Sequence, residues 1–214
     1  ELEGVFNDAT LLFDLDRALP PGSERSLVSQ RAKRVVILVT KEAHCLGDIL
    51  IKVFDGSLAL DIAAVVGNYP QLEQLAARFD LPYHFISHQG LTRKQHEAAL
   101  LDVIKPYQPE YLVLAKFMRI LTPEFVAQYP NKIINIHHSF LPAFIGANPY
   151  QQAFERGVKI IGATAHFVND ELDEGPIIQQ MVAPVDHNFS ADDMARAGRD
   201  VEKSALSKAL QLVV

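Results

Sequence analysis

The chain has 214 residues, of which 49% are hydrophobic and 21% are charged, and its mean hydropathy is close to zero. This profile is typical of a globular protein with one large core and excludes a disordered chain. The net charge of −6 disfavours a binder of the nucleic-acid backbone. The lone Cys45 excludes an intrachain disulfide framework, and no apolar stretch approaches the roughly 18 residues that span a bilayer. We therefore expect a cytoplasmic protein without nucleic-acid or membrane partners.

The first thirty residues differ in character from the rest. They combine short apolar patches with acidic residues and run into Pro20-Pro21-Gly22-Ser23, a turn or linker composition. This pattern predicts the end of one domain plus a linker over residues 1–30, and a main domain over residues 31–214. Because the chain begins at Glu1 rather than methionine, we expect the body of the first domain to lie upstream.

The main domain alternates strand patterns with helix patterns. Runs of β-branched residues predict strands, and apolar residues at helical spacing predict helices. The predicted strands cover 34–40, 60–66, 83–86, 111–114, 133–136, 160–168 and 177–182. The predicted helices cover 45–54, 71–79, 92–104, a segment from residue 122, 151–156 and 190–212. This alternation predicts an α/β, Rossmann-like fold with a mostly parallel central sheet and helices on both faces.

Three arrangements that would carry chemistry are disfavoured. The turn after the first strand, 41–48, has one glycine, whereas loops that cradle a dinucleotide or a phosphate need several. His44 and Cys45 are adjacent and would not share a helix face, which disfavours a catalytic pair. His84 and His88 have a metal-binding spacing only on a helix, and their surroundings are not helical. The sequence therefore predicts no metal site.

Polar side chains gather where the strand 133–136 ends. The period of two along a strand puts Asn135, His137 and Ser139 on one side as the chain leaves the sheet. Ligands of open α/β sheets bind at the carboxyl ends of strands, where an amide and an imidazole can act on a substrate. The alternative is that these residues only cap the next turn, and residue type alone leaves both interpretations open.

Two loops near other strand ends have two interpretations each. The apolar loop 116–123 either packs against the core or forms a wall for a flat aromatic ligand, and residue type favours packing. The acidic loop 169–176 follows the strand that carries His166. Such a loop is normally a solvated turn, and a catalytic role requires one carboxylate to point inward. The sequence does not say which carboxylate that is.

Taken together, these motifs resemble the folate-dependent formyltransferase superfamily. The matching residues are Asn135-Ile136-His137 with Ser139, Leu141 and Pro142, then Gly162–Val168 with His166, Asp173, and Gly175–Ile178. Segments 40–48, 144–150 and 191–202 are most similar to the deformylase branch, and the glycine-rich phosphate loop of the ribonucleotide transferases is absent. The resemblance runs from residue 34 to the C-terminus and implies the formyltransferase fold. Residues 1–30 resemble the end of an ACT-like regulatory domain plus a linker.

The resemblance also implies a reaction. It is the hydrolysis of 10-formyltetrahydrofolate to formate and tetrahydrofolate, which supplies formate for purine biosynthesis and balances the one-carbon folate pool. A folate substrate, no required cofactor, no metal and a homo-oligomer are implied with it. One alternative is a transferase that moves the formyl group to a small amine such as glycinamide ribonucleotide. The other is a non-catalytic folate-binding regulatory module, which requires Asp173 to lie away from Asn135 and His137.

Roles for single residues follow from the same resemblance. Asn135 and His137 would donate hydrogen bonds to the oxyanion, and Asp173 would hold and deprotonate the attacking water. His166 would orient Asp173 or the substrate, while His138 stands where many transferase relatives have proline and receives no chemical role. The resemblance also matches Arg119–Leu121 and the loop Asp170–Asp173 to backbone segments that bind the pterin, which reverses the preference for packing in the loop 116–123. The other implied folate contacts are Met118, Arg119, Ile120, Leu121, Ser139, Gly146, Asp170, Glu171 and Leu172.

Overall fold

The computed structural model describes residues 8–20, 22–23, 31–143 and 149–214, without the side chains of residues 8, 9 and 12. The chain divides into two compact units, Glu1–Arg31 and Ala32–Val214. The first unit contains the helix α1 (Asp8–Ala18), which the sequence reasoning did not predict. The signal was present, because the partly buried Leu11 and Leu15 lie four residues apart, at helical spacing.

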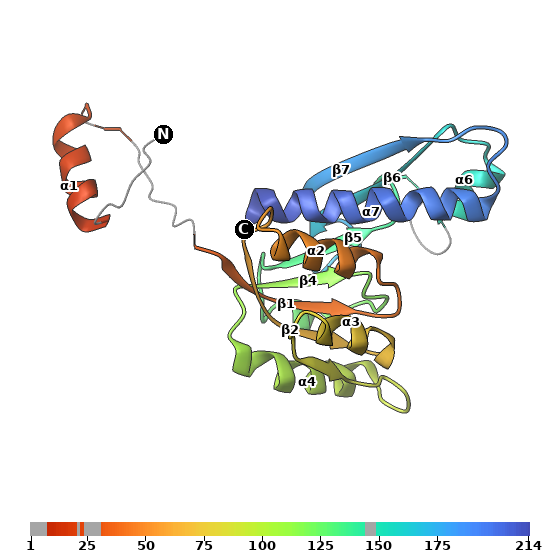
Figure 1. The fold of residues 1–214 in the computed structure, drawn as a ribbon, viewed down its shortest axis with the longest axis horizontal. Coiled ribbons are helices and arrows are strands. Elements are labelled where there is room, and N and C mark those ends of the chain that lie inside the picture. Colours follow the sequence, from red (N-terminus) through yellow and green to blue (C-terminus); the bar gives the residue numbers. More distant parts are fainter. Residues whose placement is uncertain (1–7, 21, 24–30, 144–148) are drawn as a thin grey trace. The chain divides into compact units, whose positions relative to one another are not determined.

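The second unit is built on a seven-stranded sheet with the order β3-β2-β1-β4-β5-β6-β7 (Figure 1). All neighbouring strands from β3 to β5 are parallel, whereas β6 is antiparallel to both β5 and β7. The predicted α/β class and mostly parallel sheet are confirmed. The strands are β1 (Lys33–Val39), β2 (Leu60–Gly67), β3 (Tyr83–Phe85), β4 (Tyr111–Ala115), β5 (Ile133–His137), β6 (Ile160–Phe167) and β7 (Ile177–Pro184).

Helices cover both faces of this sheet, as predicted. The helices are α2 (His44–Phe54), α3 (Glu73–Ala77), α4 (Arg93–Ile104), α5 (Pro123–Val126), α6 (Pro149–Glu155) and α7 (Ala191–Val213). Their bounds agree with the predicted ones within a few residues, except that the predicted helix 71–79 is a 3₁₀ turn, Pro70–Leu72, followed by the short α3. In the described part of the chain, no helix is both long and apolar enough to cross a membrane.

The central strand β1 explains why both faces need cover. Its residues Val35, Ile37 and Val39 point into a core that α2 and α7 close, and Val36 and Leu38 point into a second core closed by α4 and α5. All five side chains are fully buried. A strand buried on both faces is typical of parallel α/β sheets, which accounts for the unbroken apolar run that identified β1 in the sequence.

The antiparallel strand β6 brings distant polar residues together. Its register sets His166 opposite Asn135 and Thr164 opposite His137 on β5. The loop 168–176 then leads back toward β7, and Gly175 lies so close to the backbone of Phe167 that a Cβ there would overlap the carbonyl oxygen. A glycine is therefore needed for the loop to return this tightly.

The last helix, α7, is fixed to the sheet by a buried ionic cluster. Its Glu202 carboxylate lies 3.1 Å from Lys116 Nζ, 2.7 Å from His44 Nε2 and 2.6 Å from the hydroxyl of Tyr150. These four residues are called the Glu202 cluster below. Gly198, one turn before Glu202, makes room for Tyr150, because a Cβ there would overlap the tyrosine hydroxyl. The cluster therefore joins α7 to the ends of three other elements.

The close return of the loop 168–176 can be tested with a glycine substitution. We expect Gly175→Ala to lower the free energy of unfolding by about 1–3 kcal/mol, because the added methyl group overlaps backbone atoms. Denaturant unfolding followed by circular dichroism measures this change. Gly47→Ala in α2 is the control, since a Cβ there meets no atom within 4 Å and alanine favours helix. Equal stability of the two variants would contradict the close approach.

The Glu202 cluster makes a second prediction. We expect Glu202→Ala to lower the free energy of unfolding by about 3–5 kcal/mol, because it leaves Lys116 buried without its counter-charge. The matched control is Glu124→Ala, which removes a carboxylate paired with Lys94 at the exposed surface. Such pairs contribute little to stability, so the control should unfold at nearly the same denaturant concentration as the wild type.

The same cluster predicts a dependence of stability on pH. Burial raises the pKa of Glu202, but the hydrogen bond from His44, the charge of Lys116 and the hydrogen bond from Tyr150 lower it to about 2, from a usual 4.5. A carboxyl group whose pKa is lower in the folded state stabilises the fold above its unfolded pKa and loses this effect on acidification. The stability difference between wild type and Glu202→Gln should therefore shrink from about pH 4.5 to about pH 2. A constant difference over that range would contradict the lowered pKa.

Candidate active site

The register of β5 and β6 creates a pair between Asn135 and His166. The Asn135 amide nitrogen lies 3.2 Å from His166 Nε2. The other ring nitrogen, Nδ1, lies 2.9 Å from the carbonyl oxygen of Phe167 and donates to it, so Nε2 is the acceptor of the amide hydrogen. Burial lowers the pKa of His166, which keeps the imidazole neutral. His166 therefore orients the Asn135 side chain.

Asp173 reaches the same place from the loop between β6 and β7. Its Oδ2 lies 3.3 Å from His137 Nδ1, and its Oδ1 lies 3.7 Å from His166 Nε2. The backbone of Asp173 is left-handed, with φ of 58°, a conformation that Asp adopts more readily than most residues. Burial raises the pKa of Asp173, but the hydrogen bond and charge of His137 outweigh it, and the pKa lies below its usual value. The carboxylate is therefore ionised at neutral pH.

One buried polar atom of this group has no hydrogen-bond partner among the described residues. His137 directs Nδ1 toward Asp173, and its Nε2 is buried with no hydrogen-bond partner among the described residues. Buried polar atoms are nearly always paired, so an unpaired imidazole nitrogen beside a carboxylate needs an explanation. A substrate oxygen bound at Nε2 would provide it. The structure thus brings together Asn135, His137, His166 and Asp173, four of the residues selected from the sequence. We call them the catalytic cluster after the role that the family resemblance implies.

Ser139 lies in the turn after β5. Its hydroxyl donates to the carbonyl oxygen of Ala143 at 2.8 Å, and its own carbonyl oxygen accepts from the Thr164 hydroxyl at 2.9 Å. The side chain is buried, so in this structure its polar atoms serve the turn. Gly146, another residue selected from the sequence, lies outside the described residues.

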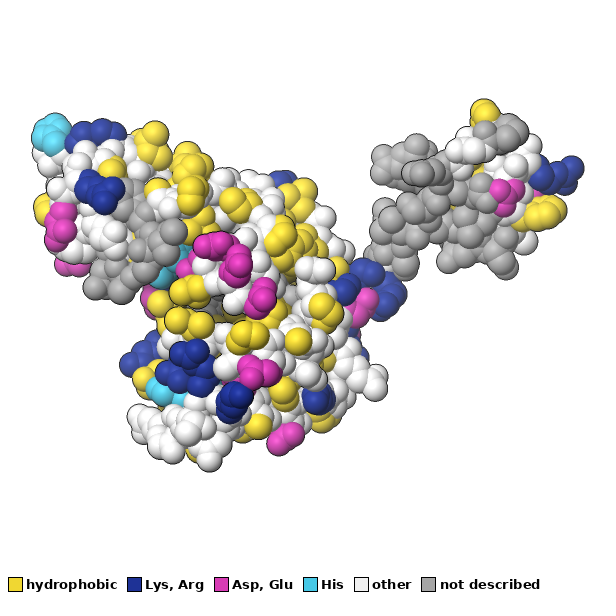
Figure 2. Space-filling view, turned by 180° about the vertical axis from the view of Figure 1, so that it is seen from behind, with side chains coloured by type: hydrophobic (Ala, Val, Ile, Leu, Met, Phe, Trp, Pro, Cys, Tyr) yellow, Lys and Arg dark blue, Asp and Glu magenta, His cyan; other side chains and the backbone are white. Residues whose placement is uncertain are grey.

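The remaining selected residues lie on two loops. In the loop after β4, Met118 and Ile120 are 54% and 51% exposed, whereas Leu121 packs against the core that contains α4. Arg119 is partly exposed, and Asp170, Glu171 and Leu172 of the loop after β6 are exposed. Figure 2 shows hydrophobic side chains around a hollow on one face of the main unit. The loop after β4 therefore combines packing at Leu121 with exposed apolar side chains, where the sequence had offered these as alternatives.

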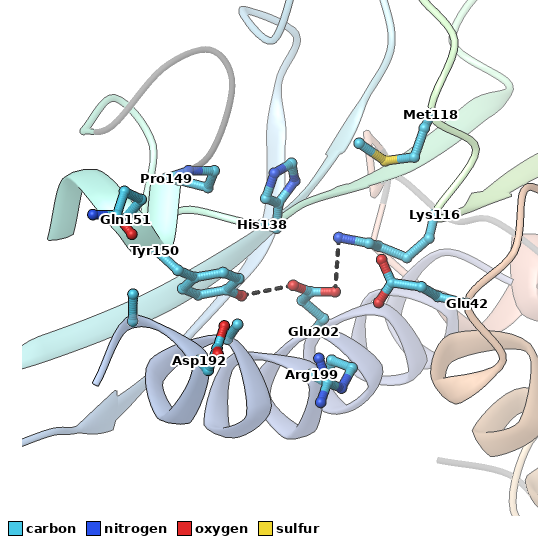
Figure 3. A pocket seen from close by; sticks show the side chains of 12 residues that line it. Glu42, Lys116, Met118, His138, Pro149, Tyr150, Gln151, Asp192, Arg199 and Glu202 are labelled. Atoms are coloured by element: carbon cyan, nitrogen blue, oxygen red, sulfur yellow. Dashed lines mark hydrogen bonds and ion pairs between the residues drawn. The ribbon is translucent and has the colours of Figure 1, made fainter. Parts of the chain in front are cut away.

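A cavity of about 440 Å³ opens at the carboxyl ends of β1, β4 and β5, between these strands and the helices α6 and α7 (Figure 3). The strand order reverses between β1 and β4, and open α/β sheets bind their ligands at such a point. The Glu202 cluster contributes three side chains to the wall, and His138, the residue after His137, contributes a fourth. The cavity is lined by Glu42, Lys116, Met118, His138, Pro149, Tyr150, Gln151, Ala191, Asp192, Ala195, Arg199 and Glu202.

The sequence reasoning missed three of these side chains: Lys116, Tyr150 and Glu202. Glu202 belongs to the charged middle of the last helix and was not selected as a site residue, but its side chain is 1% exposed. The helical spacing contained a signal, because Gly198, Glu202 and Ala205 lie on one buried stripe of α7. Lys116 has a left-handed backbone, with φ of 62°, which no pattern in the sequence indicated.

His44, Cys45 and Glu202 place potential metal-ligand atoms within 4.8 Å of one another. Two features of these residues disfavour a metal ion. The Lys116 ammonium lies 3.1 Å from the Glu202 carboxylate and competes for the same oxygen. Burial raises the pKa of Cys45 well above its usual value, so the thiol keeps the proton that a metal ligand must lose.

The chain is similar to known proteins in sequence and in fold. Residues 33–210 match the family model described as formyl transferase. A formyltetrahydrofolate deformylase from Escherichia coli (strain K12) is 66% identical over 214 residues, which are all of this chain and 76% of the relative. The solved structure of a formyltetrahydrofolate deformylase from Pseudomonas syringae pv. tomato has a TM-score of 0.82 and 43% identity over 85% of this chain and 61% of that one.

The fold alone does not separate the branches of this family. The solved glycinamide ribonucleotide transformylase 1 from Symbiobacterium toebii has a similar TM-score of 0.80, over 89% of this chain and 92% of that one, with 30% identity. Sequence identity makes the distinction, because it is 66% to the Escherichia coli deformylase. The chain spans about three quarters of the length of that relative and about three fifths of the Pseudomonas structure. The chain belongs to the formyl transferase family and, within it, to the formyltetrahydrofolate deformylases.

Proposed function

We propose that this chain hydrolyses 10-formyltetrahydrofolate to formate and tetrahydrofolate. The observation that carries the proposal is the pairing of Asp173 with His137 at 3.3 Å beside Asn135, with His137 Nε2 left unpaired. This arrangement offers a base and two donors around one point, which hydrolysis of an amide-like formyl group requires. The name of the Escherichia coli relative, at 66% identity, supports the same reaction.

The first step is attack on the formyl carbon. The ionised Asp173 accepts a proton from a water molecule, and the water oxygen forms a bond to the carbon. The carbonyl oxygen becomes an oxyanion, which accepts hydrogen bonds from the Asn135 amide and from His137 Nε2. Asp173 Oδ2 lies 3.3 Å from His137 Nδ1 and holds the imidazole in place, so donation from Nε2 requires a hydrogen on both ring nitrogens. Loss of one such donor typically lowers the rate by about 10²–10³.

The second step breaks the bond between carbon and nitrogen. The oxyanion re-forms the carbonyl group, and the folate nitrogen leaves with the proton that Asp173 received from water. The products are tetrahydrofolate and formic acid, which releases its own proton to the solvent. No electron acceptor is needed, because the carbon keeps its oxidation state. In line with the family resemblance, we propose that the reaction requires neither a cofactor nor a metal.

For the folate ring we propose two loops, one after β4 and one that carries Asp173. They are Met118–Leu121 after β4 and Asp170–Leu172 after β6, with His166, Ser139 and Gly146 as further contacts implied by the family. The exposure of Met118, Ile120 and Leu172, each above half, supports the proposal. Large apolar side chains at a surface are favoured where an aromatic ligand covers them.

The alternatives differ in how well the site supports them. A transferase would need to anchor its amine acceptor, and the turn from Thr40 to Ala43 between β1 and α2 contains no glycine for a phosphate loop. A non-catalytic module required Asp173 to lie apart from His137, and the two side chains are 3.3 Å apart. Hydrolysis is the function that the geometry supports best.

We also propose a domain assignment for residues 1–30, an oligomeric state and a location in the cell. We propose that residues 1–30 are the end of an ACT-like regulatory domain, which the separate compact unit Glu1–Arg31 supports. A homo-oligomeric state and a cytoplasmic location are what the resemblance implies for a folate enzyme. Size-exclusion chromatography with light scattering would determine the oligomeric state.

The direct test of the reaction needs no acceptor. The protein is incubated with 10-formyltetrahydrofolate in buffer free of amines, and formate is measured with formate dehydrogenase. We expect stoichiometric release of formate and tetrahydrofolate. If no formate forms without an amine, and the formyl group is transferred when glycinamide ribonucleotide is added, the chain is a transferase and the proposed hydrolysis is wrong.

The role of Asp173 makes a separate prediction. We expect Asp173→Asn to lower kcat by at least about 10²-fold with little change in KM, because the amide keeps the shape of the side chain but cannot accept the proton. Initial rates of formate release give both constants. Glu174→Gln, which removes the adjacent exposed carboxylate, should keep the wild-type rate. A near wild-type kcat for Asp173→Asn would remove Asp173 from the mechanism.

A further inference from the structure

His138 lies between the catalytic cluster and the cavity. Its ring centroid is 5.2 Å from that of His137, with an angle of 34° between the two planes. On another side it lies 6.2 Å from the ring of Tyr150, and it lines the cavity together with Lys116 and Glu202 (Figure 3). A molecule that moves from the cavity toward His137 therefore passes this imidazole.

The ring of His138 is free to accept a hydrogen bond. Burial lowers its pKa to about 4, and the charge of Lys116 acts in the same direction. Glu202 and Asp173 oppose this effect but do not reverse it, so the imidazole is neutral near pH 7. A neutral imidazole has one acceptor nitrogen. No hydrogen bond between described residues engages this ring.

The other titratable acceptors in the cavity wall are engaged or belong to exposed residues. The Glu202 carboxylate receives hydrogen bonds or charge contacts from Lys116, His44 and Tyr150. The carboxylates of Glu42 and Asp192 belong to exposed residues. Among the titratable side chains that line the cavity, His138 is therefore the partly buried acceptor that remains available.

Hydrolysis needs such an acceptor. This step rests on the proposed function, in which Asp173 takes one proton of the attacking water. A water molecule held by one hydrogen bond still rotates about it, and a second acceptor fixes the oxygen lone pair toward the carbon. His137 connects the two groups, because its ring centroid lies 5.2 Å from that of His138 and its Nδ1 lies 3.3 Å from Asp173 Oδ2.

We propose that His138 is a further catalytic residue, whose ring accepts a hydrogen bond from the attacking water as that water enters from the cavity. The water oxygen forms the bond to the formyl carbon while Asp173 receives one proton. Asp173 then passes this proton to the folate nitrogen as the bond between carbon and nitrogen breaks. The second proton remains on the new hydroxyl group beside His138 until formic acid leaves and releases it to solvent. His138 thus favours water as the nucleophile.

The first test compares two histidine substitutions in the full chain. We expect His138→Leu, which removes the acceptor at similar volume, to lower kcat for formate release by at least about 10-fold with KM within about 2-fold. His138→Asn, whose amide oxygen accepts a hydrogen bond, should recover part of the loss. The matched control is His187→Leu, because His187 lies exposed in the turn before α7. A wild-type kcat for His138→Leu would overturn the proposal.

The second test measures which nucleophile is used. Hydroxylamine is added, and the ratio of formohydroxamate to formate is determined for wild type and His138→Leu. The proposal predicts that the ratio rises at least about 10-fold, because a stronger nucleophile depends less on being positioned. A merely structural change lowers both products together, so an unchanged ratio would overturn the proposal.

Chemical rescue covers the case in which His138→Leu does not fold. His138→Ala leaves a space for added imidazole, and we expect imidazole to restore formate release at least about 5-fold by supplying the missing acceptor. No rescue of a variant with a wild-type melting curve would contradict the role of His138. Failure of the wild type to release formate would instead overturn the proposed function, so the two failures are distinct.

Discussion

The contact between Asp173 and His137 is the interaction on which the site depends. The two residues are 36 positions apart, and the antiparallel strand β6 with its returning loop brings them to 3.3 Å. The same strand sets His166 opposite Asn135, so a single change of strand direction assembles all four side chains of the catalytic cluster. Gly175 permits the loop to close, and the left-handed backbone of Asp173 directs its carboxylate to the imidazole.

The Glu202 cluster is the second group of buried polar side chains, and it holds the helix α7 in place. A buried carboxylate with three donors fixes α7 to the ends of β4, α2 and α6, and these elements enclose the cavity beside His138. Buried ion pairs contribute little net stability over apolar packing, but breaking them is costly. The contacts with Lys116, His44 and Tyr150 also keep the Glu202 carboxylate from acting as a base or as a metal ligand.

Much of this could be predicted from the sequence. The buried strand β1 and the helices α2, α4 and α7 follow from apolar patterns, and Asn135, His137, His166 and Asp173 were selected before any geometry. The sequence could not tell which carboxylate of the loop 169–176 points inward without the family resemblance, because that depends on one backbone conformation. Lys116 and Glu202 were missed, since a charged residue on a helix or after a strand is usually solvated. The pairing that keeps them buried joins residues 86 positions apart and is invisible to local patterns.

A double-mutant cycle on the pair His137 and Asp173 tests the central claim most directly. The kcat/KM for formate release is measured for wild type, His137→Asn, Asp173→Asn and the double variant, with folding verified by circular dichroism. If the two side chains act as one unit, the double variant is about as slow as the slower single variant, as is found for catalytic groups that function together. If the two losses instead multiply, the side chains act independently, and the account of a joined carboxylate and imidazole is wrong.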